Sequence, residues 1–338
     1  MSYQTSSFLV SCVGAYAGCG NGTGGFVCIH NDKTVVIDEL DCTGLYQDND
    51  TVYRFVRALN KVVGYNKEGI KYTIRLQEVK DGHDLIIKDN RIICVSTGTN
   101  EIHWYDCLGN LVKKWKADGE GDAWHLNSIS ISDGELYVSA FGEFKEHRGW
   151  TNNRSKEKGF VLNLESGKKV LENLSSPHHP KYINGNLLVC NSLVDSLIVK
   201  SSSGKVNKIC LNGFTRGIAY DNNYLYVGES QNRKMQEKSH SSIAIIELKT
   251  LQVIDRIKVP FSEIYEIILI DSEFAKKIVE ETEKYVLSKS DLTYFRNQLI
   301  VESRKAEKLR KHLEIMKKKQ TYNLAIKTKN KIKKILKT

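Results

Sequence analysis

The chain has 338 residues, an apolar share of 41% and a formal net charge of +10. This length suits one large domain with an appendage, or two domains, and the apolar share is ample for a core. No apolar run is long enough to span a bilayer, and no two of the eight cysteines form a C-x-x-C pair. The sequence therefore argues against a membrane helix, a zinc knuckle and a dithiol redox motif.

The positive charge is concentrated at the C-terminal end. Residues 271–338 hold 19 Lys and Arg against 9 Asp and Glu, a difference of +10, so residues 1–270 hold 31 of each sign. The net charge of the chain therefore comes from the tail, and it does not indicate which ligand the neutral body binds. We predict two domains, a body over 1–271 and a basic helical tail over 272–338.

Short apolar strands separated by turns recur along the body. The N-terminal part supplies three of them, at 7–14, 25–30 and 34–40. Five fuller units of four strands follow, and each opens on a polar or small residue at the start of its first strand. The openers are Gly44, His83, His125, His178 and Arg216. Such a repeat is typical of a propeller or a solenoid.

One more strand, 263–270, follows the fifth full unit and supplies the strand that the N-terminal part lacks. The repeat therefore predicts an all-β, six-bladed β-propeller that is closed by a C-terminal strand, which would remove the free edges of an open stack. A β-sandwich would not explain the recurring polar opener. A seven-bladed ring would need strands after residue 271, where the pattern becomes helical.

The first strand of each propeller blade lines the central channel, so the unit openers should converge at one channel mouth. We expect catalytic groups among His83, His125, His179 and Glu266, and ligand contacts from a second set. That second set is Asp84, Asn127, His178, Arg216, Glu229 and Gln231. Pro177 and Pro180 bracket the histidine pair and should hold its backbone rigid.

Histidines at three successive blade entries could bind a divalent metal, because imidazole is a common metal ligand. The predicted ligands are His83, His125 and His178, with Glu229 or Glu266 as a fourth ligand or a general base. The alternative is that these imidazoles hydrogen-bond to neighbouring blades and to channel water. The sequence does not identify any other cofactor.

Arg216 predicts an anionic ligand, a carboxylate or a phosphate, because its guanidinium can hold either in bidentate fashion. The alternative is an ion pair with Glu229 or Glu266 across the channel. Both can hold if the ligand joins an existing charge network.

Three long loops should lie on the face of the channel mouth, where ligand sites are usually built. They are 14–25, 142–159 and 229–241. The first contains a G-x-G-x-x-G match, but a strand pattern and not a helix follows it, so we interpret it as a loop and not as a dinucleotide site. Trp150 could stack on a sugar ring or anchor its loop.

The tail begins with a predicted helix over 273–288, whose Phe274, Ile278 and Tyr285 could pack on the body. Apolar residues at three- and four-residue steps from Leu292 to Met316 then predict a short coiled coil, which would form a homodimer or pack back on the body. The lysine-rich end, 324–338, could contact an anionic membrane surface or an acidic partner, or serve only as a solubilising tail. We do not expect nucleic-acid binding, because a lysine-rich segment can contact phosphates but does not recognise specific bases.

Several motifs resemble an uncharacterised bacterial six-bladed propeller family, a domain of unknown function. They are His83–Asp84, His125–Ser128, Pro177–Pro180, Thr215–Gly217 and Gly228–Ser230. The resemblance covers about residues 80–270 and implies the fold, a shared site and an association with surface-polysaccharide gene clusters. More distantly, the chain is similar to gluconolactonase-like and strictosidine-synthase-like propellers, but it lacks the lactonases' calcium shell.

These observations lead to a functional hypothesis with one alternative. The hypothesis is a small anionic, carbohydrate-related ligand at the channel mouth, with a metal-assisted lyase or epimerase activity. The alternative is a non-catalytic adaptor in a cytoplasmic polysaccharide-biosynthesis assembly. The N-terminus lacks the pattern of a secretory signal. We therefore expect a cytoplasmic location, extended to the inner membrane face if the basic end binds lipid.

Overall fold

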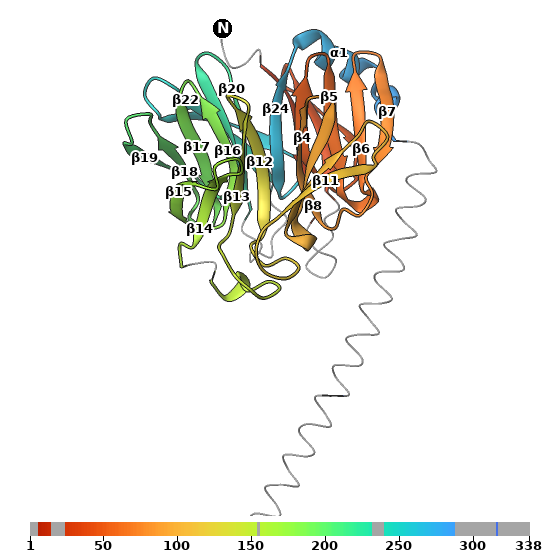
Figure 1. Cartoon of the computed structure of the whole chain (residues 1–338). Coiled ribbons are helices and arrows are strands. Elements are labelled where there is room, and N and C mark those ends of the chain that lie inside the picture. The colour runs from red at the N-terminus through yellow and green to blue at the C-terminus, as the bar shows by residue number, and fades with distance from the viewer. Residues whose placement is uncertain (1–5, 15–23, 154–155, 232–239, 288–315, 317–338) are drawn as a thin grey trace, which may run out of the picture. The chain divides into compact units, whose positions relative to one another are not determined.

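A computed structural model describes residues 6–14, 24–153, 156–231, 240–287 and 316. Six four-stranded antiparallel sheets stand around a common centre (Figure 1), which confirms the predicted six-bladed β-propeller. The chain divides into two units, 1–286 and 287–338, and the first contains all six sheets. The coiled-coil segment and the basic end at 324–338 lie outside the described residues, Met316 excepted.

The strands run outward from the centre in chain order within each of the last five sheets. The second sheet holds β4 (Cys42–Asp48), β5 (Thr51–Val56), β6 (Lys61–Asn66) and β7 (Gly69–Arg75). The third holds β8 (Gly82–Lys88), β9 (Arg91–Ser96), β10 (Glu101–Tyr105) and β11 (Leu111–Lys116). The fourth holds β12 (Leu126–Ser132), β13 (Glu135–Ala140), β14 (Gly159–Asn163) and β15 (Lys169–Leu174).

The remaining sheets complete the ring. The fifth holds β16 (Pro177–Ile183), β17 (Asn186–Asn191), β18 (Ser196–Lys200) and β19 (Val206–Cys210). The sixth holds β20 (Phe214–Tyr220), β21 (Tyr224–Ser230), β22 (Ser241–Glu247) and β23 (Val253–Val259). The first holds β24 (Ile264–Ile270), β1 (Ser7–Cys12), β2 (Gly25–His30) and β3 (Lys33–Asp38), with β24 innermost and paired with β1.

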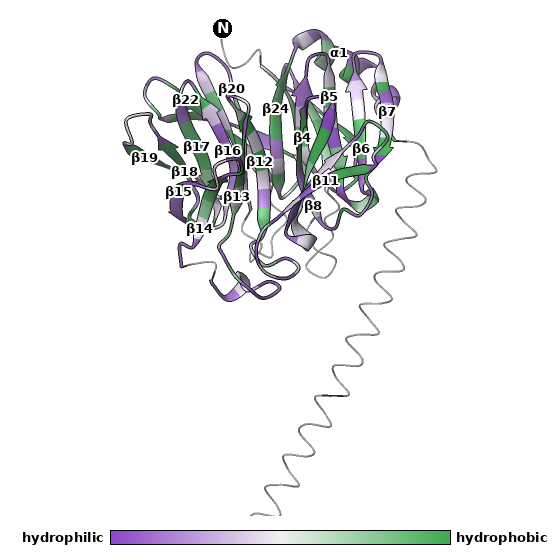
Figure 2. Cartoon of the chain, viewed as in Figure 1, coloured by the Kyte–Doolittle hydropathy of each residue, from purple (hydrophilic) through white to green (hydrophobic). Residues whose placement is uncertain are grey.

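The innermost strands contact one another in a closed cycle, β24, β4, β8, β12, β16 and β20. Short 3₁₀ turns follow some of the second strands, at η2 (Arg57–Leu59), η3 (Thr97–Thr99) and η5 (Ser192–Val194), and η4 (Thr151–Asn153) lies in the fourth-blade loop. Strand interiors are hydrophobic, whereas the loops at the lower edge of the view are largely hydrophilic (Figure 2). Apolar clusters between neighbouring sheets form the core, as expected for stacked sheets that bury both faces.

A buried ion pair joins the first two blades. The guanidinium of Arg54 on β5 donates to both carboxylate oxygens of Asp38 on β3, each over 2.6 Å, and it also donates to Tyr65 Oη. Bidentate geometry and the extra hydrogen bond offset the cost of removing both charges from water.

A bulge interrupts the innermost strand of every blade. At each bulge, one or two residues of the innermost strand have no paired residue on the neighbouring strand. A bulge of this kind redirects the side chains of these residues. These residues are Tyr265 in the first blade, Thr43 and Gly44, His83 and Asp84, Asn127 and Ser128, His179 and Pro180, and Gly217 in the sixth.

Helix α1 (Ser272–Glu280) follows the last strand. Asp271 caps it by accepting a hydrogen bond from Phe274 N over 2.9 Å. The expected packing residues Phe274, Ile278 and Tyr285 are all buried. The predicted single helix over 273–288 ends earlier, at Glu280, and the turn η6 (Thr282–Lys284) follows it.

None of the helices in the described part is both long and apolar enough to cross a bilayer. The seven described cysteines are free, and those at 12, 28, 42, 94 and 190 are buried.

Candidate functional site

A tyrosine bridges the channel between opposite blades. The hydroxyl of Tyr265 on β24 donates to Asn127 Oδ1 on β12 over 2.7 Å, and both residues are buried. The ring of Tyr265 also faces the imidazoles of His83 and His179, with centroids 6.1 and 5.1 Å away. Tyr265 was missed by the sequence analysis, although it lies between Glu263 and Glu266 in the final strand.

His83 and His125 lie side by side at the mouth, with ring centroids 5.2 Å apart. His83 Nδ1 donates to Asp81 O over 2.8 Å, and His125 Nδ1 donates to the carboxylate of Asp122 over 2.9 Å. In the neutral form, each ring therefore carries its lone pair on Nε2. Burial lowers the pKa of His83 to about 4, so this imidazole is neutral at pH 7.

His178 has the same tautomer but is completely buried. Its Nδ1 donates to Ser176 O over 2.9 Å, and the Ser192 hydroxyl lies 2.8 Å from the same nitrogen. Among the described residues, Nε2 of His178 has no hydrogen-bond partner. Burial, followed by the charge of Arg216, holds the pKa of His178 well below its usual range.

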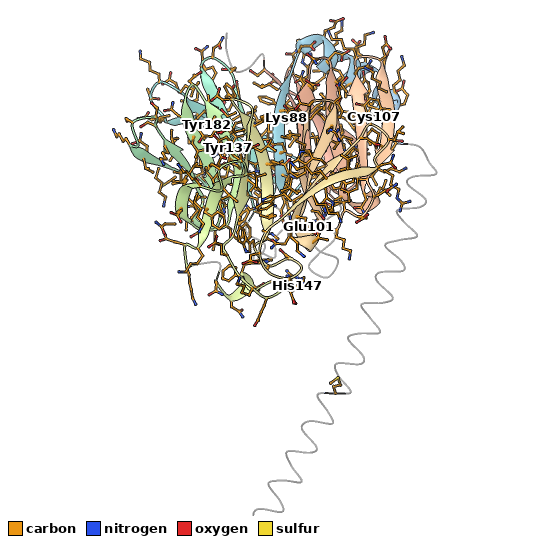
Figure 3. The ribbon with its side chains drawn as sticks, viewed as in Figure 1. Lys88, Glu101, Cys107, Tyr137, His147 and Tyr182 are labelled. Carbon is orange, nitrogen blue, oxygen red and sulfur yellow. The ribbon has the colours of Figure 1, made fainter. Side chains whose placement is uncertain are left out.

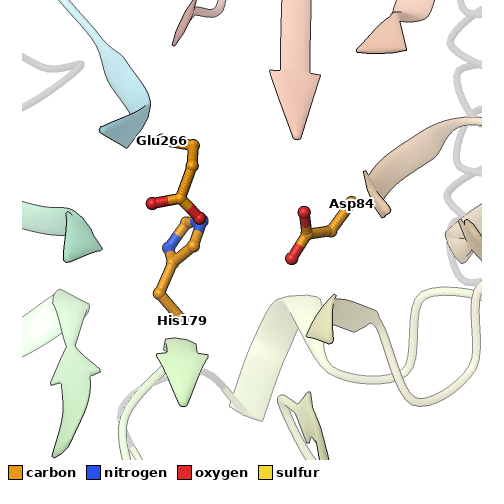
Figure 4. A group of neighbouring side chains, drawn as sticks. All are labelled: Asp84, His179 and Glu266. Atoms are coloured by element: carbon orange, nitrogen blue, oxygen red, sulfur yellow. The ribbon is translucent and has the colours of Figure 1, made fainter. Parts of the chain in front are cut away.

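Asp84, His179 and Glu266 form a second, deeper group, in which the carboxylate of Glu266 stands beside the His179 ring and Asp84 faces them (Figure 4). Each side chain accepts a backbone N–H of the adjacent blade. Ile129 N donates to Asp84 over 2.9 Å, Gly217 N to His179 Nδ1 over 3.0 Å, and Ile218 N to Glu266 over 3.3 Å. The group therefore also joins neighbouring blades.

The hydrogen bond from Gly217 fixes the tautomer of His179. Because its Nδ1 accepts, its Nε2 carries the proton in the neutral ring. Glu266 Oε2 lies 3.2 Å from that Nε2, but this buried N–H forms no hydrogen bond within the described residues.

Burial is the largest influence on the charge of this deeper group. It raises the pKa of Asp84 well above its usual value, with a further contribution from Glu266, and it also raises the pKa of Glu266 itself. It lowers the pKa of His179 far below the usual value, and Lys181 and Arg216 add to this shift. Neutral forms of Asp84 and His179 are therefore favoured at pH 7.

The arrangement fits a metal only in part. His83, His125 and His178 each donate from Nδ1 to an oxygen, as metal-ligating histidines do. However, the predicted set of His83, His125 and His178 is not among the groups whose ligand atoms lie close together. Across the described ranges, the one group of three with all ligand atoms within 4.8 Å is Asp84, His179 and Glu266. There the N–H on His179 Nε2 opposes coordination.

Arg216 is already engaged by a carboxylate. Its Nη1 lies 3.1 Å from Glu263 Oε2, and its guanidinium stacks on Phe214 and Tyr265, 4.7 and 5.5 Å from the ring centroids. The ion-pair partner is thus Glu263 and not Glu229 or Glu266, the two partners considered from the sequence.

Glu229 and Gln231 differ from the other predicted ligand contacts. The carboxylate of Glu229 accepts from Arg256 Nε over 2.8 Å, from the Ser242 hydroxyl and from Asn212 N, which places its bonds within and beside the sixth blade. The backbone N–H of Gln231 donates to Ser262 O.

The polar residues between second and third strands join blades. Thr97 donates to Leu126 O over 2.6 Å, Ser192 to Thr215 O over 2.6 Å, and Ser230 to Ile264 O over 3.1 Å. In each pair, a hydroxyl of one blade bonds to a carbonyl in or beside the first strand of the next. These hydrogen bonds hold the channel lining in place.

The fourth-blade loop folds over the mouth residues. Figure 3 shows His147, from this loop, on the face opposite Lys88. Trp150 is buried, its ring centroid lies 4.2 Å from that of His125, and its Nε1 donates to Asp122 O. Trp150 is therefore a loop anchor. Much of the loops 14–25 and 229–241 lies outside the described residues.

Comparison with known families decides the family membership. The model of a domain of unknown function, DUF4915, matches residues 58–278, which is more than half of the chain. The chain belongs to the DUF4915 family. No curated protein matches it.

Solved structures share the fold at low sequence identity. A chain of a nidogen/laminin complex is 11% identical with a TM-score of 0.58, and a protein of unknown function from Bacteroides caccae is 13% identical with a TM-score of 0.57; each covers 79% of this chain and 99% of its own. Regucalcin from Agrobacterium tumefaciens, a calcium-binding protein, is 15% identical with a TM-score of 0.51, over 70% of this chain and 82% of its own. At these identities, the similarities show only that the DUF4915 chain has the propeller fold.

Proposed function

We propose that the channel mouth of this propeller binds a small anionic, carbohydrate-related ligand and moves one of its protons, as a lyase or an epimerase does. The observation that carries the proposal is a pair of buried imidazole nitrogens, Nε2 of His178 and of His179, which form no hydrogen bond within the described residues. Buried polar atoms are nearly always hydrogen-bonded in proteins, so such a pair beside a channel mouth fits a polar ligand.

The protonation states support this reading of the mouth. The lone pair of His178 Nε2 can accept a hydroxyl proton, and the N–H of His179 Nε2 can donate to a carboxylate or carbonyl oxygen. Neutral His83, with its pKa near 4, can take up a proton without first losing one. Asp84 in its neutral form can supply one.

The class of ligand and the location belong to the proposal. Arg57 and Arg216 lie near the blade entries and pair with Asp41 and Glu263, so an anionic ligand would join an existing charge network there. The carbohydrate class rests on the family resemblance and its polysaccharide association. Free, mostly buried cysteines support a reducing, cytoplasmic compartment. A divalent metal is not required for this proton transfer.

The test is calorimetric titration of the full chain with D-gluconate, D-glucuronate and D-galacturonate, together with metal analysis of the purified protein. We expect one of these sugar acids to bind, and His178→Gln to weaken that binding about tenfold, the loss of one hydrogen bond to a charged ligand. His103→Gln is the matched control, because His103 is equally buried but bonds to Glu101 and Tyr105 on β10. If the wild-type chain binds none of them, the adaptor alternative gains support.

A further inference from the structure

His125 is the most exposed of the described mouth imidazoles, and its Nδ1 donates to a side-chain carboxylate. The His125 side chain is 12% exposed, against 9% for His83, whereas His178 and His179 are almost fully buried. Asp122, itself buried, accepts the Nδ1–H of His125 over 2.9 Å. In its neutral form, His125 therefore holds its lone pair on Nε2, the nitrogen away from Asp122.

The ring of His125 is also fixed by its neighbours. Phe141 and Trp150 clamp it, with ring centroids 4.3 and 4.2 Å away. Its backbone has a φ of 52°, in the left-handed region that non-glycine residues rarely adopt. Such strain persists where the surrounding structure over-determines it, and it is frequent at active sites.

The fourth-blade loop brings a cation to the same corner. Arg148 Nε lies 4.0 Å from Asp122 Oδ2, and the guanidinium stacks on Trp150, 5.2 Å from the ring centroid. Backbone bonds hold this part of the loop, since Arg148 N donates to Asp122 O and Asp122 N donates to His147 Nδ1. The Arg148 side chain is nevertheless 51% exposed.

Arg148 and Arg216 therefore differ in availability. Arg216 is 8% exposed and is paired with Glu263 over 3.1 Å, whereas Arg148 is half-exposed and its carboxylate contact is longer. The charge of Arg148 also acts on Asp81, at the entry of the neighbouring third blade. Burial raises the pKa of Asp81, but the charges of His83, Arg57, His125 and Arg148 lower it overall.

We propose that Asp122, His125 and Arg148 form the reacting corner of the mouth: His125 accepts the ligand's proton, Asp122 is its positioning residue, and Arg148 binds the ligand's anionic group. This inference deepens the proposed function and rests on it. In the step, a new N–H bond forms at Nε2 and the bond from that hydrogen to the ligand breaks. The ligand atom keeps the electron pair, and the imidazolium faces the carboxylate of Asp122.

The positioning role is tested without any ligand, by ¹⁵N NMR of histidine-labelled full-length protein. We expect wild-type His125 to be a single Nδ1–H tautomer and Asp122→Asn to convert it to a mixture. His83 provides an internal reference, because its Nδ1 is bonded to a backbone carbonyl. Asp118→Asn is the matched control, since Asp118 is 73% exposed and pairs with Lys145. A wild-type Nε2–H tautomer, or no change in Asp122→Asn, would overturn this role.

The anion role is tested by calorimetry with D-glucuronate and inorganic phosphate. We expect Arg148→Gln to weaken binding about tenfold and Lys145→Gln, a neighbouring exposed cation, to leave it unchanged. If the wild-type chain binds a probe and Arg148→Gln binds equally well, the anchor role is wrong while the proposed function stands. If no anion binds to the wild type, both fail, and the tautomer measurement still decides the Asp122–His125 pair.

Discussion

The second and third blades use the same backbone feature for different purposes. Both innermost strands carry a two-residue bulge at the same position, formed by Thr43 and Gly44 in β4 and by His83 and Asp84 in β8. In the second blade the bulge only joins blades, because Thr43 donates to Gly82 O over 3.2 Å and Gly44 leaves room for Asp84. The bulge is thus a general scaffold, and the side chains placed on it decide the chemistry.

The largest expected effect comes from filling the space at Gly44. A methyl group there would lie 2.5 Å from Asp84 Oδ1 and 2.8 Å from Leu85 N, closer than such atoms can approach. Gly44→Ala should lower the free energy of unfolding by about 3 kcal/mol, as overpacking does. Urea denaturation measures it, and an unchanged midpoint would mean that the two bulges are not packed as described.

The next effect separates the acceptor role of Asp84 from its charge. Asp84 accepts the N–H groups of Leu85 and Ile129, so Asp84→Ala leaves two buried donors unpaired and should cost roughly 2.5 kcal/mol. Asp84→Asn keeps an acceptor for only one of these donors, because Leu85 N and Ile129 N donate to different carboxylate oxygens. Its cost near pH 7 should therefore be smaller than that of Asp84→Ala, since one donor stays paired. Equal costs for the two variants in denaturation experiments would mean that the charge of Asp84, and not its acceptor oxygens, stabilises the fold.

His83 in the third-blade bulge should make the stability of the fold depend on pH, whereas Thr43 and Gly44 in the second-blade bulge do not ionise. The pKa of His83 is lowered from 6.5 to about 4 in the folded state, so the unfolded chain binds more protons between these values. The stability from neutral His83 is present above pH 6.5 and is lost as pH falls through 4, with about 2 kcal/mol lost between pH 7 and pH 5. His83→Gln should lose less stability than the wild type over this range, measured by urea midpoints. Thr43→Val should follow the wild-type profile.

The smallest effect concerns the second-blade bulge itself. Thr43→Val removes one hydroxyl and leaves Gly82 O without that donor, which should cost about 1 kcal/mol at any pH. Thermal unfolding at pH 5 and pH 7 checks both the size and the pH independence. A strongly pH-dependent cost would show that the second blade also takes part in the channel's titration.

The sequence predicted the ring because strands and turns repeat with a polar residue at each inner-strand entry. It also predicted that His83, Asp84, Asn127 and His179 share the channel, since all of them follow a unit opener. It could not predict the pairing of Arg216 with Glu263, because which carboxylate reaches the guanidinium depends on side-chain direction at the bulges.

Two residues were missed for different reasons. Tyr265 lies inside the last strand, where a tyrosine is usually core, and the bulge directs it across the channel. Asp122 lies three residues before His125, a local signal that could have been read. Conversely, the sequence does not show that Glu229, a predicted ligand contact, pairs with Arg256 on the outermost strand of the same blade.

The partnership of β24 with β1 has a consequence for biosynthesis. The strand that must lie beside residues 7–12 is residues 264–270, so it leaves the ribosome only after the other five sheets have been made. Until then β1 presents an unpaired edge that invites association with other chains, and the nascent protein depends on rapid completion or on chaperones.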